Sequence, residues 1–253
     1  MERPVATAVS DTPTHPTDET TTAGAESTDS DLVPFSDLAR ACYCPRQCYY
    51  ARRDDDRSVP ASVRSVQELA YRYPELRDSE TDLTAAPVAV PPAEYRDRLA
   101  GLAERPDWAA LSAPPERDVY LAGKDCHGVA HKLLPGVGDG DPPPVPVIVS
   151  PGAPHETGVW EPQSVRAVAA AKALAWQRER EVPLALVEYP AHAVVRSVRL
   201  SVRRTAAYRR ALRTTRGIDG PPPRLRDSPR CGPCDYREEC GVETESLWSR
   251  LRP

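Results

Sequence analysis

Three cysteines near the C-terminus constrain the fold more than any other feature of this sequence. Cys231, Cys234 and Cys240 lie within CGPCDYREEC and have the spacing C-x2-C-x5-C. Thiols this close together predict a metal or cluster site, and both iron-sulfur clusters and structural zinc prefer four thiolates. A cysteine from a distant part of the chain must therefore complete the set, and that bond would close a large loop.

The segment SDLARACYCPRQCYY offers the best fourth ligand. Ser36 is expected to cap a helix that ends before Pro45, and Pro45 can open the next helix as its first residue. Cys44 then lies at a helix N-terminus, where the dipole and the unpaired N–H groups favour a thiolate. Cys42 and Cys48 compete with it, although burial as a small apolar residue is expected for Cys48. Spacing alone does not choose between iron and zinc.

Composition narrows the class of protein. The longest apolar-rich stretch, AVAAAKALAW, contains a lysine and is much shorter than the roughly 20 residues that span a bilayer. No basic region followed by an apolar run opens the sequence, so we expect a cytoplasmic protein. Disulfides are rare in that compartment, and an odd number of cysteines, seven, agrees better with metal binding.

Charge is distributed unevenly along the chain. Residues 1–31 are acidic and rich in Ser and Thr, which predicts a disordered acidic tail ahead of a domain at 32–253. The stretch 196–230 holds eleven arginines against two aspartates, a charge that attracts phosphate backbones. Within it, we expect Arg203, Arg204 and Arg209 to bind DNA, single-stranded rather than duplex, by phosphate contacts that do not read sequence.

The middle of the chain alternates strand and helix patterns. β-leaning runs at 117–123, 127–134 and 145–150 precede a long apolar-patterned helix at 161–180, whose apolar positions include Trp176. Two further strands, LALVEYP and VVRSVRLS, and a basic helix follow. A helix is also expected at about 62–72, before a proline-interrupted region. The order helix, three strands, helix, strand predicts an α/β domain with a mixed sheet flanked by helices.

The combination of CPRQCYY, this order of elements and CGPCDYREEC resembles the CRISPR-associated RecB-like exonucleases over residues 33–241. These belong to the PD-(D/E)XK nuclease superfamily, which has a restriction-endonuclease-like core. The resemblance implies a 4Fe-4S cluster held by Cys44, Cys231, Cys234 and Cys240, with cluster segments at 36–52 and 228–242 that join the two ends of the domain. It also implies CRISPR adaptation or DNA-repair proteins as partners.

The catalytic motifs of that family are missing. Two carboxylates and a lysine would hold Mg or Mn at the scissile phosphate. His131 occupies the position of the first acid, and VPVIVSPG, where the second acid and the lysine are expected, contains neither. At the two positions of the family's helix motif Q-x-x-x-Y, this sequence has Arg166 and Ala170. The acids Asp125, Glu156 and Glu188, with Lys124 and Lys132, are the available substitutes, and each acid is expected to be a solvated loop or strand-end group.

Three functions follow from these observations. The first is a cluster-containing DNA-binding protein that has kept the nuclease fold without its catalysis. The second is an active single-stranded DNA exonuclease whose metal ligands have moved. The third is an iron-sulfur or zinc module that binds an acidic protein and no nucleic acid. A histidine metal site at His127, His131 and His155 is disfavoured, because no i, i+4 pair on a helix supports it.

Overall fold

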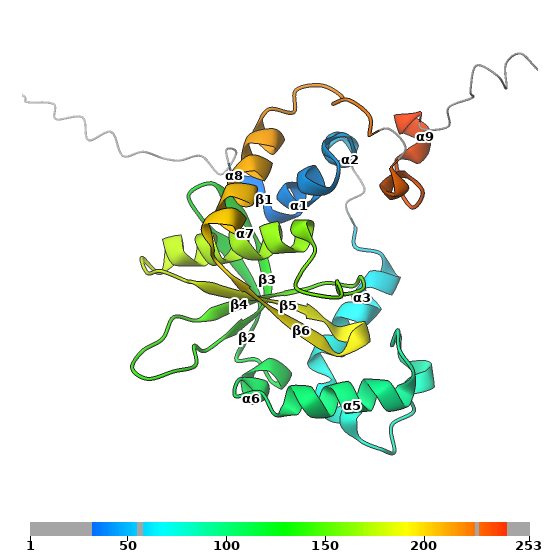
Figure 1. The fold of residues 1–253 in the computed structure, drawn as a ribbon, viewed down its shortest axis with the longest axis vertical. Helices are drawn as coiled ribbons and strands as arrows, with labels where there is room; N and C mark the ends of the chain where they lie inside the picture. The colour runs from blue at the N-terminus through cyan, green and yellow to red at the C-terminus, as the bar shows by residue number, and fades with distance from the viewer. Residues whose placement is uncertain (1–31, 55–57, 226–227, 242–253) are drawn as a thin grey trace, which may run out of the picture. The chain divides into compact units, whose positions relative to one another are not determined.

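The computed structural model describes residues 32–54, 58–225 and 228–241, and a single mixed sheet organises them (Figure 1). Its strands are β1 (Val33–Pro34), β2 (Glu116–Ala122), β3 (Cys126–Leu134), β4 (Val145–Val149), β5 (Leu184–Tyr189) and β6 (Val194–Arg199). The order is β1-β3-β4-β5-β6, and β2 also pairs with β3. β1–β3 and β4–β5 are parallel pairs, and the other pairs are antiparallel. The parallel pair β4–β5 requires a long crossover, which a helix supplies.

Helices cover both faces of this sheet (Figure 1). α1 (Phe35–Tyr43), α7 (Glu161–Gln177) and α8 (Val202–Arg216) pack together on one face. The other face is covered by α3 (Ala61–Glu68), α4 (Tyr73–Arg77), α5 (Pro92–Ala103) and α6 (Trp108–Ser112). Two short helices, α2 (Pro45–Ala51) and α9 (Arg237–Cys240), belong to the segments that carry the predicted cysteine ligands. Each face has its own apolar core.

Helix α7 approaches the sheet closely because its buried side is made of small residues. Five alanines between positions 167 and 173 are buried, together with Val165, Val168 and Leu174. Phe35 of α1 lies equally close to β3: a Cβ on Gly128 would come within 2.5 Å of its ring, and Gly128 has a φ of +155°. Only glycine combines that backbone conformation with that approach.

The predicted α/β class with a mixed, helix-flanked sheet is confirmed. The predicted strands, the long helix, the basic helix and the helix near 62–72 are present with small shifts of their ends. Ser36 is not the N-cap of α1, because the helix begins at Phe35 after Pro34. Trp176 does not face the core and is 59% exposed. The predicted acidic tail lies outside the described residues. No helix in the described ranges is long and apolar enough to cross a membrane.

Candidate functional site

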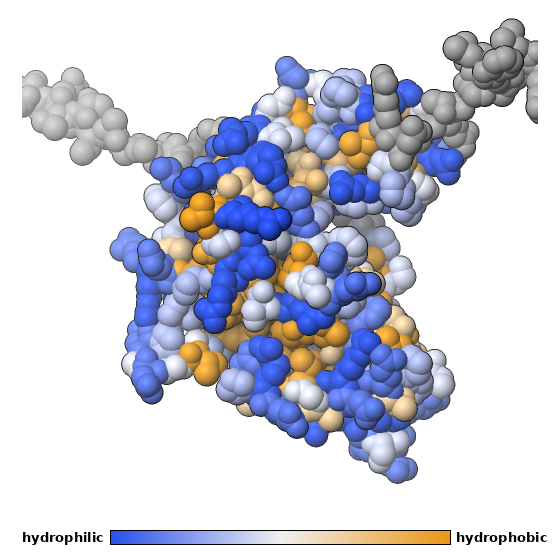
Figure 2. Space-filling model, viewed as in Figure 1, coloured by the Kyte–Doolittle hydropathy of each residue, from blue (hydrophilic) through white to orange (hydrophobic). Residues whose placement is uncertain are grey.

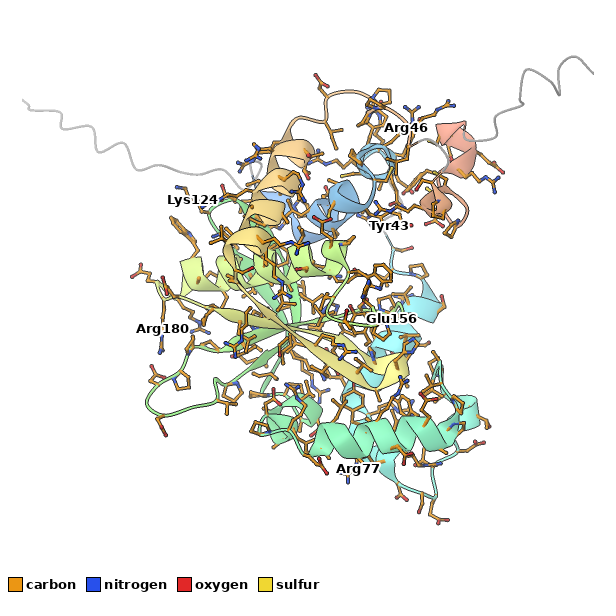
Figure 3. All side chains as sticks on the ribbon, in the orientation of Figure 1. Tyr43, Arg46, Arg77, Lys124, Glu156 and Arg180 are labelled. Atoms are coloured by element: carbon orange, nitrogen blue, oxygen red, sulfur yellow. The ribbon has the colours of Figure 1, made fainter. Side chains whose placement is uncertain are left out.

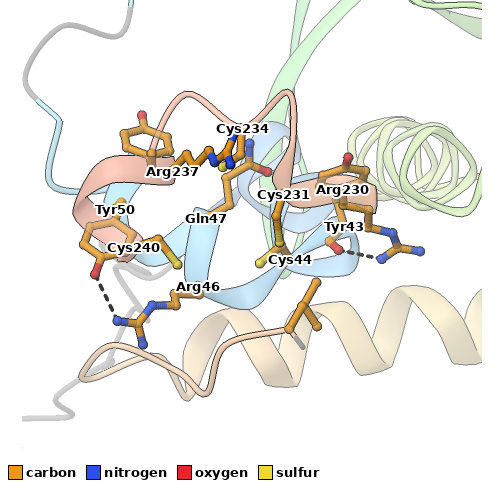
Figure 4. A pocket seen from close by; sticks show the side chains of 12 residues that line it. Tyr43, Cys44, Arg46, Gln47, Tyr50, Arg230, Cys231, Cys234, Arg237 and Cys240 are labelled. Carbon is orange, nitrogen blue, oxygen red and sulfur yellow. Dashed lines mark hydrogen bonds between the residues drawn. The ribbon is translucent and has the colours of Figure 1, made fainter. Parts of the chain in front are cut away.

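The four cysteines named as ligands line one hollow, formed by the α1–α2 junction and the C-terminal segment 229–241 (Figure 4). Cys44 comes from the first part, and Cys231, Cys234 and Cys240 come from the second. Nearly the whole described chain separates them in sequence. The fold therefore places all four of these thiols on the lining of one hollow.

Cys44 is placed by the junction between two helices. It is both the C-cap of α1 and the N-cap of α2, and its own N–H donates to the Arg40 carbonyl at 2.7 Å. Pro45 then opens α2, as predicted. An extended residue between two helices turns the chain and directs the Cys44 side chain toward the C-terminal segment (Figure 4).

The other cysteines do not line this hollow. Cys48 is fully buried, and its Sγ lies 3.5 Å from the Asp37 carbonyl. Cys126 is buried beside the Tyr208 hydroxyl, and burial raises its pKa to about 11. Burial, followed by the charge of Glu161, raises the pKa of Cys42 to about 11 as well. Cys42 and Cys126 remain thiols at neutral pH, and the predicted burial of Cys48 is confirmed.

Polar and aromatic contacts attach the C-terminal segment to α2. The Tyr50 ring stacks on Tyr236 with centroids 6.0 Å apart, and its hydroxyl donates to the Glu239 carbonyl at 3.1 Å. Tyr236 donates to Asp54 Oδ2 at 3.0 Å, and Arg230 donates to the Tyr43 carbonyl at 2.7 Å. Neither α9 nor the 3-10 turn at Pro229–Cys231 contains a buried residue.

The lining of the hollow is electropositive apart from its thiols. Arg46, Arg230 and Arg237 contribute to it, and no carboxylate does. Burial raises the pKa of Cys234, and the neighbouring Cys44 and Cys240 raise it further because thiolates repel one another. All-sulfur ligands suit iron-sulfur clusters or zinc, whereas Mg and Mn require oxygen. The donor set therefore fits a four-thiolate centre.

The sulfur atoms are not gathered around one point. Across the parts of the chain that the structure describes, no group of three or more His, Cys, Asp or Glu side chains is arranged to hold a metal ion. The hollow has the ligands of a four-thiolate centre, but the side chains would have to close in on it.

His131 occupies the position where the first catalytic carboxylate is expected, and its side chain interrupts the pairing of β3 with β4. β3 and β4 pair regularly at Lys132–Val147, but beyond that pair the Val149 N–H donates to His131 Nδ1 at 3.2 Å instead of to a strand carbonyl. The imidazole thus replaces a bond of the ladder. Its other nitrogen, Nε2, lies 3.2 Å from the Gln67 side-chain amide.

This imidazole is neutral and both its nitrogens are engaged. Burial, followed by the charges of Arg166 and Lys132, lowers the pKa of His131 to about 3. Since Nδ1 accepts from Val149, Nε2 must carry the proton. The Gln67 nitrogen is placed nearest to it, and exchanging the amide oxygen and nitrogen gives Nε2–H an acceptor. No nitrogen lone pair of His131 is left to bind a metal.

Lys132 and Glu188 form an ion pair whose side chains are 0% exposed. Lys132 Nζ donates to Glu188 Oε1 at 2.9 Å and to the carbonyls of Ala70 and Leu111 at 2.6 and 2.7 Å. Burial raises the pKa of Glu188 and lowers that of Lys132, and the contact between them opposes both shifts. The expectation that Glu188 is a solvated group is wrong: it fastens the sheet to the helices of the other face.

The remaining substitute acids do not converge with this pair. Asp125 lies in the β2–β3 turn, 3.4 Å from Arg216, and Glu156 lies in the β4–α7 loop. Lys124 and Glu156 lie far apart in Figure 3. Two of the histidines considered as metal ligands have other contacts: His127 contacts Tyr120, and His155 contacts Trp160.

Two of the three predicted DNA-binding arginines lie together. Arg203 and Arg204 line an open depression of about 840 Å³ with Arg210, between the start of α8 and the start of α7; we call it the arginine hollow. Arg210 pairs there with Glu161. Arg209 is exposed but lies about 100° around the helix from Arg210, outside the hollow.

Figure 2 shows hydrophilic residues gathered over α8. Sequence reasoning missed Arg210, although its i+7 spacing from Arg203 places both on one side of α8.

Comparison with known proteins adds no family to this description. No protein-family model matches the chain, and the search of curated proteins gives no significant match.

Proposed function

We propose that this protein is an iron-sulfur, DNA-binding member of the RecB-like branch of the PD-(D/E)XK fold that lacks nuclease activity. The observation that carries the proposal is the common hollow of Cys44, Cys231, Cys234 and Cys240. Thiols this distant in sequence lining one arginine-rich hollow are explained by a centre that they bind together. A 4Fe-4S cluster would add negative charge, which Arg46, Arg230 and Arg237 would balance.

The order of elements supports the choice of fold. β2, β3, β4, α7 and β5 follow one another as three antiparallel-linked strands, a crossover helix and a strand parallel to β4. This is the order on which the resemblance to RecB-like nucleases rests. The fourth cysteine lies before this core and the other three lie after it, as in that family.

The residues at the positions of the nuclease catalytic motifs support the loss of catalysis. His131 is neutral and fully engaged, and β4 continues into Ser150, Pro151 and Gly152 without a carboxylate or lysine. Glu188 and Lys132, the one acid–lysine pair within the strands, are sealed between the two layers. A divalent ion at the scissile phosphate requires several oxygens converging on an accessible point, and these residues do not provide them.

The cluster is tested by measuring iron and acid-labile sulfide in protein purified without oxygen. About four irons and four sulfides per chain, with visible absorption near 400 nm, are expected for four cysteine ligands. Stoichiometric zinc without sulfide would replace the cluster by a structural zinc site. Absence of any bound metal would remove the proposal.

DNA binding and cleavage are tested on the same cluster-loaded protein. We expect single-stranded oligonucleotides to bind with an affinity that falls steeply between about 50 and 200 mM salt, because phosphate contacts release counterions. Replacing Arg203 and Arg204 by Glu should weaken binding strongly, whereas Arg209→Glu should have the smaller effect. No cleavage is expected with Mg or Mn. Metal-dependent cleavage would instead establish an active exonuclease, and salt-independent or absent DNA binding would favour a protein-docking module.

A further inference from the structure

A second groove lies on the other side of the α7 N-terminus from the arginine hollow. It has a volume of about 850 Å³ and lies between α1, the β4–α7 loop, the first turn of α7 and the loop that carries the C-terminal cysteines. We call it the Trp160 groove. Its lining includes Arg40, Tyr43, Gly152, Trp160, Gln163 and Arg230.

Trp160 presents a fixed aromatic face to this groove. Its side chain is 49% exposed, yet its Nε1 donates to the Ala153 carbonyl at 3.1 Å and its ring meets the His155 ring edge-on at 4.4 Å. An exposed indole that is already immobilised loses little conformational freedom when another ring stacks on it. Gly152 and Ala153, which also line the groove, have little or no side chain to fill it.

The polar groups of the groove suit a nucleotide. Gln163 lines the groove, and its Oε1 is buried without a hydrogen-bond partner among the described residues, so this oxygen can accept from a base edge once the side chain turns into the groove. Arg40 and Arg230 add positive charge, and the Arg230 guanidinium is held over the Tyr43 ring, 5.1 Å from its centroid. The groove also follows the carboxyl end of β4, where ligands of α/β sheets commonly bind.

The Trp160 groove and the arginine hollow share Glu161, so the two depressions meet at the first turn of α7. Stacking faces combined with a basic track are the elements that bind single strands without sequence preference, since every base has a π face. Arg203, Arg204 and Arg210 supply such a track, and Trp160 lies beside it.

We propose that the Trp160 groove takes an unpaired nucleobase of a single strand whose phosphates lie along the arginine hollow. This inference rests on the proposed DNA binding and specifies its substrate: a strand with exposed bases, in preference to a duplex. The base stacks on Trp160 and its edge faces the Gln163 amide, while Arg40 and Arg230 lie near the adjoining backbone.

The test compares oligonucleotide affinity of Trp160→Ala with that of Trp176→Ala in the cluster-loaded full chain. Trp176 lies on the same helix, is 59% exposed and lines neither depression, so it is a matched control. We expect roughly a 10-fold loss for Trp160→Ala, from one lost stacking contact, and no change for Trp176→Ala. Trp160→Phe should keep most of the affinity, which separates stacking from misfolding.

Oligonucleotides with abasic positions provide the second arm. They should bind the wild type about as weakly as intact oligonucleotides bind Trp160→Ala. If the wild type binds single strands with the expected salt dependence but Trp160→Ala binds equally well, the groove assignment fails and the proposed function stands. If the wild type binds no DNA, the proposed function itself fails. Binding of dAMP as tightly as a strand, lost in Trp160→Ala, would assign the groove to free nucleotides and overturn the proposal.

Discussion

The buried Lys132–Glu188 pair gives a sharp test of whether these two residues hold the fold or perform chemistry. Lys132→Met removes the only ammonium that contacts Glu188 and leaves the carbonyls of Ala70 and Leu111 without their donor. Breaking a buried ion pair on one side typically costs about 3 to 5 kcal/mol. That is a large part of the roughly 5 to 15 kcal/mol that stabilises an ordinary domain.

The measurement is thermal unfolding followed by circular dichroism, without oxygen. Since each kcal/mol lowers the Tm of a domain of this size by about 2 to 4 °C, we expect Lys132→Met to melt roughly 10 °C lower than the wild type. The double variant Lys132→Met/Glu188→Leu should recover part of that loss, because no carboxylate is then buried without a partner.

A pH series sharpens the same test. In Lys132→Met, burial outweighs the remaining contacts of Glu188 with Tyr73 and Arg105 and raises its pKa above the unfolded value, so the folded state holds a proton that the unfolded state releases. The variant should therefore lose stability as pH rises above about 4.3, the usual pKa of Glu. A Tm within about 2 °C of the wild type would refute the structural role. Metal-dependent cleavage that disappears in folded Lys132→Met would assign the pair to catalysis.

Three further outcomes follow from the structure. His131 is neutral when folded, with a pKa of about 3 against about 6.5 when unfolded. Wild-type stability should therefore fall as the pH drops below about 6.5, by about 2 kcal/mol at pH 5. In urea titrations, His131→Asn should not show this loss of about 2 kcal/mol. Cys44→Ser should lower the iron content and 400 nm absorbance far more than Cys48→Ser, and equal losses would contradict the assignment of Cys44. Removing residues 1–31 should tighten oligonucleotide binding at low salt, because the acidic segment competes with phosphates for the arginines, and an unchanged affinity would exclude such competition.

The regular part of this fold is readable from the sequence because its signals are local. Short β-branched runs bounded by Gly, Asp and Pro give the strands, and the apolar pattern after Trp160 gives α7. Cys44 can be predicted as a ligand because it precedes Pro45. A proline at that position indicates the start of a helix from the sequence alone.

The region 73–115 was not resolved into helices by sequence, because its prolines were read as interruptions. Pro74 and Pro92 lie in the first turns of α4 and α5, where proline is favoured.

Tertiary packing decided the features that sequence reasoning missed. The burial of Glu188 depends on Lys132, 56 positions away, and the sequence around neither residue indicates that the two form a pair. Trp176 fits the apolar face of an ideal helix but lies beyond the part of α7 that the sheet covers. Gln163 and Trp160 become candidate binding residues only because the surrounding loops form a groove beside them, and this groove cannot be read from the sequence.

The C-terminal cysteine segment has a consequence for the lifetime of the protein in a cell. It contains no buried residue in α9 or the preceding turn and is attached mainly through Tyr50, Tyr236 and Arg230. Segments with so little buried surface open at a small fraction of the global unfolding free energy. If the four thiols hold the proposed cluster, oxidative loss of that cluster would leave the segment attached by these contacts alone, and it would open while the sheet stayed folded. The freed segment would offer proteases an entry point, so the redox state of four sulfur atoms would set the rate at which intact molecules are removed.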